Sequence, residues 1–459
     1  MLKKVPSSFR DTGGFVYTLD DAIYRRILKP SYEDYYELMN SGLYKHLVKS
    51  KCLVSHDEIL NTPNNNSEFI TIKPEQINFI SFPYEWCFSQ LKDAALLTLK
   101  ICMDSLNYGM ILKDATAYNI QFHNGKPILI DTCSLSKYKE GQVWVAYQQF
   151  CKHFLAPLLL MSKTDIRLNL LLKIHIDGIP LNLTSKLLPV KSWFSPNILA
   201  HIHLHARSQN KYEASGECAK NKIRPISKIG MLGLLHSLRK TIESLKLKNV
   251  QTEWGNYYNF TNYSENSALH KTDALLLMID RSKARTVLDV GSNNGHYSRM
   301  VAKTGSIVIS ADIDPISVEY NYLTNKNTKI SNVTPIIQDI ANPSSRIGWG
   351  HNERSSLQDR GPFELVMALA LVHHLAISNN VPFEMVAEYF SKLGKLLIIE
   401  FIPKEDSQVI KLLSSREDIF YNYNEDKFEK SFGKYYTIIN KVAIKESCRT
   451  LYLMQAKSD

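Results

Sequence analysis

The sequence lacks paired cysteines, a long hydrophobic run and an N-terminal signal. Its seven cysteines are widely spaced, and none forms the C-x-x-C pair that binds zinc or carries redox chemistry. No uninterrupted apolar stretch approaches the roughly 20 residues that cross a bilayer. No apolar run follows the lysines of the first residues, MLKKVPSSFRD. We therefore expect a cytoplasmic protein without a transmembrane segment, whose thiols stay reduced: Cys52, Cys87, Cys102, Cys133, Cys151, Cys218 and Cys448.

Concentrated charge of one sign is missing as well. The 55 Lys and Arg residues exceed the 45 Asp and Glu residues and give a formal net charge of +10. They are spread along the chain, without an Arg-rich helix or a glycine–aromatic RNA-binding signature. This distribution predicts a solvated basic surface rather than a nucleic-acid site. The length of 459 residues and the 44% of hydrophobic side chains indicate a globular protein of two domains and a connector.

The chain divides at a polar stretch near its middle. Residues 207–225 have no apolar period, so we expect a linker there, between an N-terminal domain of residues 1–206 and a C-terminal domain of residues 226–459. Apolar residues at helical spacing in Ser227–Leu247 predict an amphipathic helix that packs onto the second domain. The aromatic-rich stretch after it is interpreted as a lid over the C-terminal site or as packing beside it: Trp254, Tyr257, Tyr258, Phe260 and Tyr263.

From Thr286 onward, strand and helix patterns alternate regularly. Runs such as TVLDVG, SIVISADI, VTPIIQDI, ELVMALAL and KLLIIEFI have strand character, and helical segments separate them. This alternation predicts an α/β fold, a Rossmann-like doubly wound parallel sheet with helices on both faces. The end, Tyr436–Lys457, has the pattern of two strands joined by a turn, which predicts an antiparallel hairpin at the sheet edge. The N-terminal half mixes short strands with helices, such as the apolar run Leu91–Leu106, and is expected to be α+β.

A glycine-bracketed turn follows the first of these strands, close to Asp289. Gly291 permits a sharp turn and the close approach of a ligand where a Cβ would collide. Gly295 is expected to let the next helix lie close to the strand. A dinucleotide fold would require G-x-G-x-x-G, but Asn293 and His296 occupy its second and third glycine positions.

Two further strands end in acids. Asp312 lies about 21 residues after Gly291, where a carboxylate can accept both ribose hydroxyls of a nucleoside, and Asp314 is the alternative for that role. At the third strand end, Asp339 can accept the adenine amino group while the N–H of Ile340 faces a ring nitrogen. Strand ends of this kind meet where open α/β sheets bind ligands.

The glycine turn, the ribose acid and the adenine acid resemble those of class I methyltransferases, over roughly Trp254–Ala456. Methyl transfer requires alignment and, for a protonated acceptor, a base. His373 and His374 are the candidates for this base and Glu400 for contact with the acceptor, with strand capping and packing as the alternative for all three. The resemblance implies that S-adenosylmethionine (AdoMet) binds at Asp289, Gly291, Ser292, Asn293, Gly295, Asp312, Ile313, Asp339, Ile340 and Ala368.

A second pattern lies in the N-terminal half. Asp114, Asn119 and, at the end of the next strand, Asp131 resemble the catalytic loop of kinase-like phosphotransferases. In that loop the first acid orients a hydroxyl, while the Asn and the second Asp hold Mg²⁺. Gly14–Tyr17 and Ile23–Ile27 would be the first strands of the small lobe.

Several parts of this kinase-like pattern are missing. Lys113 replaces the usual Arg, and Thr132 and Cys133 replace Phe and Gly. Neither a G-x-G-x-x-G loop nor a strand lysine is found. We therefore favour a kinase-shaped module that binds and positions something over an active phosphotransferase, and Asn119 and Asp131 are metal ligands only under the second reading.

Three alternate histidines, His201, His203 and His205, could share one face of a strand and bind a metal. A fourth ligand is not evident in the sequence. Ordinary packing or capping is therefore the interpretation we adopt, and no metal site is predicted.

Over its whole length the chain resembles the bacterial family of the nodulation protein NoeA, through SSFRDTGGFVY, FPYEWCFSQLKDAALLTL, LKDATAYNIQF, QFCKHFLAPL, HIHLHARSQ, LDVGSNNG and IEFIPKEDSQV. The resemblance implies a kinase-like half fused to an AdoMet-dependent methyltransferase, and suggests a small-molecule or saccharide acceptor. The segment Asp312–Pro315 resembles protein methyltransferases of the ribosomal-protein type, which is one alternative. A non-catalytic AdoMet-binding scaffold is the other.

Overall fold

The computed structural model describes residues 3–20, 22–59, 69–207, 225–247, 264–414 and 417–457. The chain forms two compact units. Unit 1 comprises Met1–Val250 together with Arg346–Arg354, and unit 2 comprises Gln251–Ser345 and Ser355–Asp459. Within the described ranges, no helix has both the length and the apolar character needed to cross a membrane.

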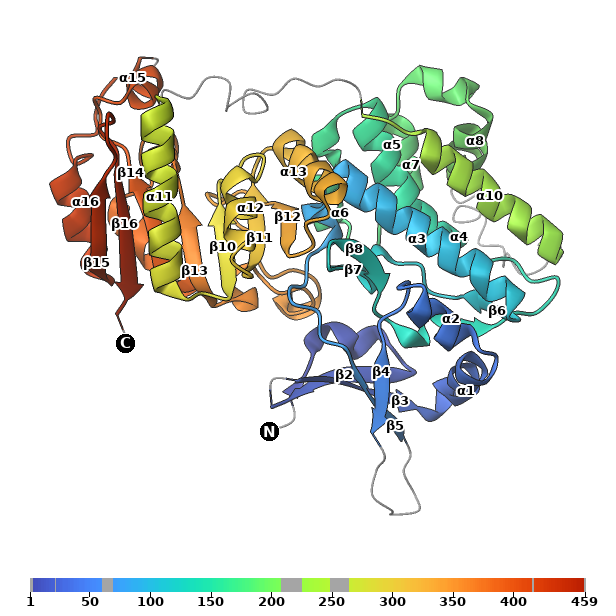
Figure 1. The fold of residues 1–459 in the computed structure, drawn as a ribbon. Helices are drawn as coiled ribbons and strands as arrows, with labels where there is room; N and C mark the ends of the chain where they lie inside the picture. The colour runs from blue at the N-terminus through green and yellow to red at the C-terminus, as the bar shows by residue number, and fades with distance from the viewer. Residues whose placement is uncertain are drawn as a thin grey trace. The chain divides into compact units, whose positions relative to one another are not determined.

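Unit 2 is built on a seven-stranded sheet of order β12-β11-β10-β13-β14-β16-β15 (Figure 1). The first five strands in this order are parallel, and β14 pairs antiparallel with β16, which pairs antiparallel with β15. The predicted doubly wound sheet with an edge hairpin is therefore present. The strands are β10 (Thr286–Val290), β11 (Ile307–Asp312), β12 (Val333–Ile337), β13 (Phe363–Ala368), β14 (Gly394–Phe401), β15 (Tyr436–Ala443) and β16 (Thr450–Ala456).

Helices cover this sheet because its central strands are apolar on both sides. Val287 and Leu288 of β10 point to opposite faces and both are fully buried. Figure 1 shows α11 running along one face, where Leu275 and Met278 join the strand side chains in a single core cluster. The helices are α11 (Glu265–Ser282), α12 (His296–Ala302), α13 (Pro315–Thr328), α14 (Phe383–Leu393), α15 (Ser407–Leu413) and α16 (Glu425–Phe432).

The described strands of unit 1 form a five-stranded antiparallel sheet and two small two-stranded sheets. The larger sheet has the order β1-β2-β3-β5-β4, and the small ones pair β6 with β9 and β7 with β8. The expected first strands of the small lobe are present as β2 and β3. Bounds are β1 (Lys3–Lys4), β2 (Gly14–Leu19), β3 (Ala22–Leu28), β4 (His56–Ile59), β5 (Phe69–Pro74), β6 (Met110–Leu112), β7 (Ile120–His123), β8 (Lys126–Leu129) and β9 (Leu135–Lys137).

The longest helix of unit 1 is α3 (Phe88–Asn107), which matches the apolar run predicted there. Leu91, Ala95 and Leu99 of this helix are fully buried. The other helices are α1 (Tyr32–Asn40), α2 (Leu43–Lys49), α4 (Tyr147–Phe150), α5 (Ala156–Lys163), α6 (Leu171–Ile174), α7 (Leu181–Leu187), α8 (Pro196–Ile198) and α10 (Lys228–Ser244), with π-helical turns at Cys151–Leu155 and Leu199–Leu204.

The helix predicted over Ser227–Leu247 is present as α10, but the expectation that it packs onto the second domain is wrong. Ser227 caps its start, since Oγ accepts the N–H of Gly230 at 3.2 Å. The helix belongs to unit 1 and runs beside α3 (Figure 1). Lys92 of α3 donates to the carbonyl oxygens of Glu243 and Leu245 at 2.9 and 2.7 Å. Most of the predicted linker, and the whole aromatic-rich stretch Trp254–Tyr263, lie outside the described residues.

A short segment between β12 and β13, Arg346–Arg354, belongs to unit 1. Glu353 is 3% exposed and accepts two hydrogen bonds from the guanidinium of Arg10, at 2.7 and 3.1 Å. The guanidinium of Arg354 lies 3.9 Å from the centre of the Tyr118 ring. This segment completes unit 1 with residues from the far half of the chain.

Candidate functional site

The glycine turn after β10 has the backbone conformation that glycine favours. Gly291 and Gly295 have φ of 72° and 76°, in the left-handed region where a Cβ is strained. The N–H groups of Gly291 and Ser292 both donate to the carbonyl of Ala311, at 2.9 and 3.1 Å, which ties the turn to β11. A Cβ on Gly295 would lie 2.2 Å from Oδ1 of Asn321. Gly295 therefore gives room to a side chain of α13, and its expected part in the packing of the next helix on the strand stays a prediction.

Asp312, at the end of β11, accepts backbone N–H groups on both carboxylate oxygens. Asn293 of the glycine turn donates to Oδ2 at 2.7 Å, and Asp314 donates to Oδ1 at 2.8 Å. Asp312 is 7% exposed, and burial raises its pKa to about 6, although the backbone hydrogen bonds oppose this shift. The backbone N–H of Ile313 also lowers this pKa by hydrogen bonding, so at least one of the roughly four acceptor positions of the carboxylate is left for a ligand hydroxyl.

Asp314, the alternative to Asp312, is used by the helix that follows. It caps α13, accepting the N–H of Ile316 on Oδ1 and the hydroxyl of Ser317 on Oδ2, both at 3.0 Å. Pro315 is the first residue of that helix, a position that suits its fixed φ. The geometry therefore favours Asp312 over Asp314 for the ribose role.

Asp289 lies within β10 and faces α12. The hydroxyl of Ser298 donates to its Oδ2 at 2.5 Å and is itself 2.8 Å from the hydroxyl of Ser310. Asp289 is 2% exposed, and burial raises its pKa to about 7, with a smaller contribution in the same direction from the charge of Asp312. The carboxyl is thus a buried acid that gains or loses its proton near neutral pH.

Asp339 and Ile340 follow the end of β12. The two strand ends are adjacent, since the N–H of Gln338 donates to the carbonyl of Asp312 at 2.8 Å. Asp339 is half-buried and accepts the N–H of Ala341 at 2.8 Å. The structure therefore brings the predicted ends of β10, β11 and β12 to one edge of the sheet. Of the other predicted positions, Ile313 is 57% exposed beside this edge and Ala368 is fully buried at the end of β13.

The two histidines after β13 differ in exposure. His373 is 2% exposed, and its Nδ1 has no hydrogen-bond partner among the described residues. His374 is half-buried. Burial lowers the pKa of His374 to about 4 and that of His373 well below its usual value. Both imidazoles are therefore neutral at pH 7.

Glu400, the third predicted catalytic residue, is fully buried in an ion pair. Its Oε2 lies 2.8 Å from Nζ of Lys271 and accepts the N–H of Ala370 at the same distance. Ala370 has a positive φ of 50°. This placement makes Glu400 a residue that fixes the backbone after β13, and contact with an acceptor is not the role that its geometry favours.

Lys271 is a residue of this region that the sequence analysis missed. It lies on α11 and is 2% exposed. Burial lowers its pKa, while the charge of Glu400 opposes the shift. A signal was present in its spacing, because Lys271 shares the buried face of the helix with Ser267, Ala274, Leu275 and Met278.

The kinase-like pattern in unit 1 is also brought together. Asn119 donates to the hydroxyl of Ser134 at 3.0 Å, and that hydroxyl donates to Asp131 at 2.8 Å. Asp114 accepts the N–H of Thr116 and the side-chain amide of Gln149. Burial, and after it the charge of Asp131, raise the pKa of Asp114.

The histidine cluster does not form a strand. His201 and His203 lie in the π-helical turn Leu199–Leu204. His201 contacts the hydroxyls of Tyr147 and Ser237 at 2.8 and 3.0 Å, and His203 those of Ser185 and Ser192 at 2.7 and 2.9 Å. The alternative of a shared strand face is therefore excluded for these two residues, and their hydrogen bonds to hydroxyl groups of unit 1 agree with the packing interpretation that we adopted.

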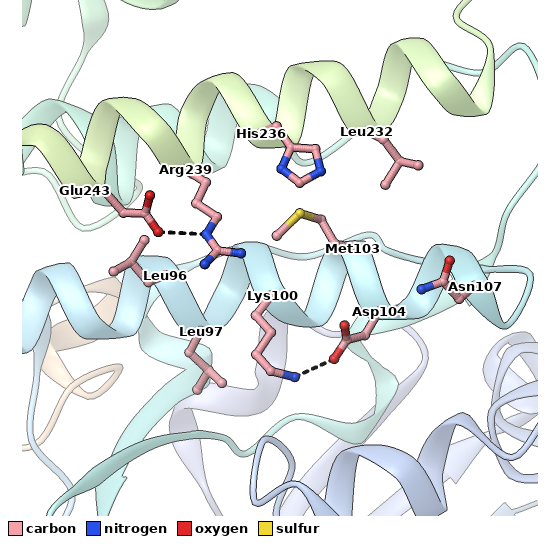
Figure 2. Close-up of a pocket in the computed structure, with 10 residues that line it drawn as sticks. All are labelled: Leu96, Leu97, Lys100, Met103, Asp104, Asn107, Leu232, His236, Arg239 and Glu243. Carbon is pink, nitrogen blue, oxygen red and sulfur yellow. Dashed lines mark hydrogen bonds and ion pairs between the residues drawn. The ribbon is translucent and has the colours of Figure 1, made fainter.

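Two cavities lie away from these strand ends. One, of about 620 Å³, is a groove between α3 and α10 (Figure 2). Its charged groups pair within their own helices, Lys100 with Asp104 at 2.5 Å and Arg239 with Glu243 at 2.8 Å, which is typical of a solvated surface. The other, of about 520 Å³, is in unit 2 at the amino ends of the parallel strands, opposite the edge that carries Asp312. Neither cavity contains the predicted site residues.

Comparisons with known proteins identify the family. No protein-family model matches the chain. Among solved structures, the magnesium protoporphyrin IX methyltransferase ChlM from Synechocystis PCC 6803 with bound SAH is 16% identical, covering 44% of this chain and 92% of its own, with a TM-score of 0.32. The N-methyltransferase NodS from Bradyrhizobium japonicum WM9 is 10% identical. The match covers 42% of this chain and 99% of NodS, with a TM-score of 0.32. The bifunctional kinase-methyltransferase WbdD is 16% identical, covering 40% and 39%, at 0.29.

These TM-scores are all below 0.5, so the assignment rests on a full-length relative. The nodulation protein NoeA of Rhizobium meliloti (strain 1021) is 33% identical over 459 residues, which cover 98% of this chain and 96% of the relative. The resemblance found in the sequence is thereby confirmed, and the chain belongs to the family of the protein NoeA.

Proposed function

We propose that unit 2 binds AdoMet and that the chain is an AdoMet-dependent methyltransferase. The observation that carries this proposal is the carboxylate of Asp312, held by N–H groups of Asn293 and Asp314 at the edge where β10, β11 and β12 end. A buried acid fixed beside a glycine turn, one strand away from the first, is the arrangement that receives a ribose in doubly wound sheets. We assign the ribose to Asp312 and not to Asp314, because the carboxylate of Asp314 caps helix α13.

The residues of this edge would each hold one part of the ligand. Asp312 accepts the two ribose hydroxyls, and Asp339 with the N–H of Ile340 faces the adenine edge. Asp289 is placed to receive the ammonium group, directly or through water, since an ammonium there needs a charged acceptor. When bound, AdoMet supplies a methyl group that its sulfonium has already activated. The protein then has to align the acceptor and, where needed, accept a proton.

His374 is our candidate for that proton acceptor. Both histidines after β13 are neutral at pH 7, because burial lowers their pKa values. His374 is the more exposed of the two, whereas His373 is 2% exposed. A group that accepts a proton from a substrate has to reach it, which favours His374.

We propose a small molecule or a saccharide as the acceptor. The rival proposal, a protein acceptor, rested on the segment Asp312–Pro315. The start of α13 accounts for half of that segment, with Asp314 as the cap and Pro315 as the first helical residue. Nothing in the segment then requires a protein substrate. A non-catalytic AdoMet-binding scaffold remains the alternative. In that case the same site binds AdoMet but no methyl group is transferred.

The experiment is a calorimetric titration of AdoMet into the full chain and into Asp312→Ala, with Asp314→Ala as the matched control. We expect binding to be lost in the first variant and kept in the second. Equal affinity of wild type and a folded Asp312→Ala would overturn the proposal. Incubation of a cell extract with labelled AdoMet then sorts the acceptors by size. Label in small or saccharide material supports the proposed class, label in protein supports the rival, and no label supports the scaffold.

A further inference from the structure

The kinase-like site of unit 1 contains a cation of its own. Arg25 lies on β3, between β2 and β5. Its Nη1 is 2.7 Å from Oδ1 of Asp131, and its Nη2 is 2.5 Å from Oδ2 of Asp11. Only 12% of the Arg25 side chain is exposed. A guanidinium stays protonated at any physiological pH, so a permanent positive charge lies against the carboxylate that a phosphotransferase would use for Mg²⁺.

The oxygens of Asp131 are already used. Oδ1 accepts the N–H of Cys133 at 2.9 Å in addition to the Arg25 contact, and Oδ2 accepts the hydroxyl of Ser134 at 2.8 Å. Three of the roughly four acceptor positions of this carboxylate are thus filled. Mg²⁺ demands near-ideal octahedral geometry, and an ion bound to Asp131 would have to displace the guanidinium and its charge.

The loop before β2 is closed in the same way. In phosphotransferases, N–H groups of a glycine-rich loop cradle phosphates. Here the N–H of Gly13 donates to Oδ1 of Asp11 at 2.8 Å. A Cβ on Gly13 would lie 2.0 Å from Oγ of Ser31, and one on Gly14 would lie 2.4 Å from the carbonyl oxygen of Arg26. The two glycines are therefore required by packing within unit 1, and Asp11 links this loop to Arg25.

We propose that Arg25 takes the place of the metal in the kinase-like site of unit 1. Its side chain neutralises Asp11 and Asp131 and holds the loop, the strand and the catalytic-loop residues together without a divalent ion. Removal of the Arg25 charge is therefore expected to leave the two carboxylates that contact it, those of Asp131 and Asp11, free to hold a divalent cation between them. This inference does not depend on the methyl transfer proposed for unit 2.

The test is a titration of the full chain with Mn²⁺, with free Mn²⁺ measured by electron paramagnetic resonance. Wild type is expected to bind no Mn²⁺ through Asp131, so that wild type and Asp131→Asn give the same curve. Arg25→Gln is expected to bind one further Mn²⁺, at least about tenfold tighter than any binding by wild type, and to lose it in Arg25→Gln/Asp131→Asn. Arg25→Lys keeps the charge and should behave as wild type.

The matched control is Arg26→Gln, on the same strand. Arg26 lies over the ring of Phe69 at 4.2 Å, and removal of its charge is expected to create no Mn²⁺ site. Mn²⁺ binding by wild type that Asp131→Asn abolishes would overturn the proposal, as would a folded Arg25→Gln without the extra site. If Arg25→Gln does not fold, recovery of the fold in Arg25→Gln/Asp131→Asn supports the proposal, because it removes the unpaired acid. A double variant that stays unfolded contradicts it.

Discussion

Lys271 and Glu400 form a buried ion pair, with Nζ of the first 2.8 Å from Oε2 of the second and side-chain exposures of 3% and 0%. The pair joins helix α11 to the end of β14, and the same carboxylate oxygen holds the N–H of Ala370. Removing one partner leaves the other as an unpaired buried charge. The pair therefore ties the stability of unit 2 to the backbone that precedes His373 and His374.

We expect Lys271→Met to lower the free energy of unfolding by about 3–5 kcal/mol, because Glu400 keeps its charge without a partner. Lys271→Met/Glu400→Gln should recover most of this loss, since neither charge remains. Chemical denaturation followed by near-UV circular dichroism measures both. Lys392→Met, which breaks an exposed pair with Glu388, is the control and should change nothing measurable. Equal losses in the single and double variants would contradict the account.

Stability and ligand affinity should depend on pH in opposite directions. Burial raises the pKa of Asp289 to about 7 and that of Asp312 to about 6, above the value of about 4 expected in the unfolded chain. The folded protein therefore binds more protons in this window, and its free energy of unfolding falls as the pH rises from about 4 to about 7.

The ammonium of AdoMet prefers the ionised form of Asp289, so its affinity should rise with pH through the same window, by up to about tenfold per unit for one coupled proton. Calorimetry at about pH 5.5, about 6.5 and about 7.5 measures this rise. Asp289→Asn should flatten the profile. A profile as steep in this variant as in wild type would assign the titration to another group.

Replacement of the helix cap should separate stability from binding. We expect Asp314→Ala to lower the free energy of unfolding by about 1 kcal/mol, the usual contribution of a cap. The N–H of residue 314 still donates to Asp312 in this variant, so AdoMet affinity should change less than about twofold. Thermal denaturation and calorimetry give the two numbers. A large loss of AdoMet affinity in Asp314→Ala would indicate that Asp314 contacts the ribose.

The two histidines after β13 should respond differently to substitution. We expect His374→Gln to slow single-turnover methyl transfer by about 100-fold or more, the usual contribution of a general base, with AdoMet affinity unchanged. His373→Gln should act on the thermal midpoint instead, because that side chain is buried. Transfer of label to the fractionated acceptor measures the rate. An unchanged rate in His374→Gln would contradict its role as the base and would leave strand capping as the function of this side chain.

The succession of strands in unit 2 could be predicted because each strand has an apolar pattern that is visible in the sequence. Val287 and Leu288 make β10 apolar on both faces, and the acid at Asp312 follows one strand later at a spacing set by the fold. The apolar pattern of the strand and the position of the acid each depend on residues that are close together in the chain. The sequence alone therefore predicts that the ends of β10, β11 and β12 meet at one edge of the sheet.

The partners of buried faces could not be predicted in the same way. The apolar face of α10 is real, with Leu235 and Leu238 fully buried, but hydrophobic burial has no direction and does not say which surface it meets. The ion pairs of Lys271 and Arg25 join residues 129 and 106 positions apart, from Lys271 to Glu400 and from Arg25 to Asp131. Spacing along the chain carries no sign of such pairs, because only the folded sheet brings them together.

The position of Arg346–Arg354 in unit 1 has a consequence for how the protein is inherited. A single break in the gene cannot separate the two units intact. A break near Val250 would put Glu353 and Arg354 on a different fragment from Arg10 and Tyr118, and a break after Arg354 would divide unit 2. Exchange of one unit by recombination would leave a mismatched partner for Glu353 and Arg354. We therefore expect the two units to be inherited together rather than exchanged separately by recombination.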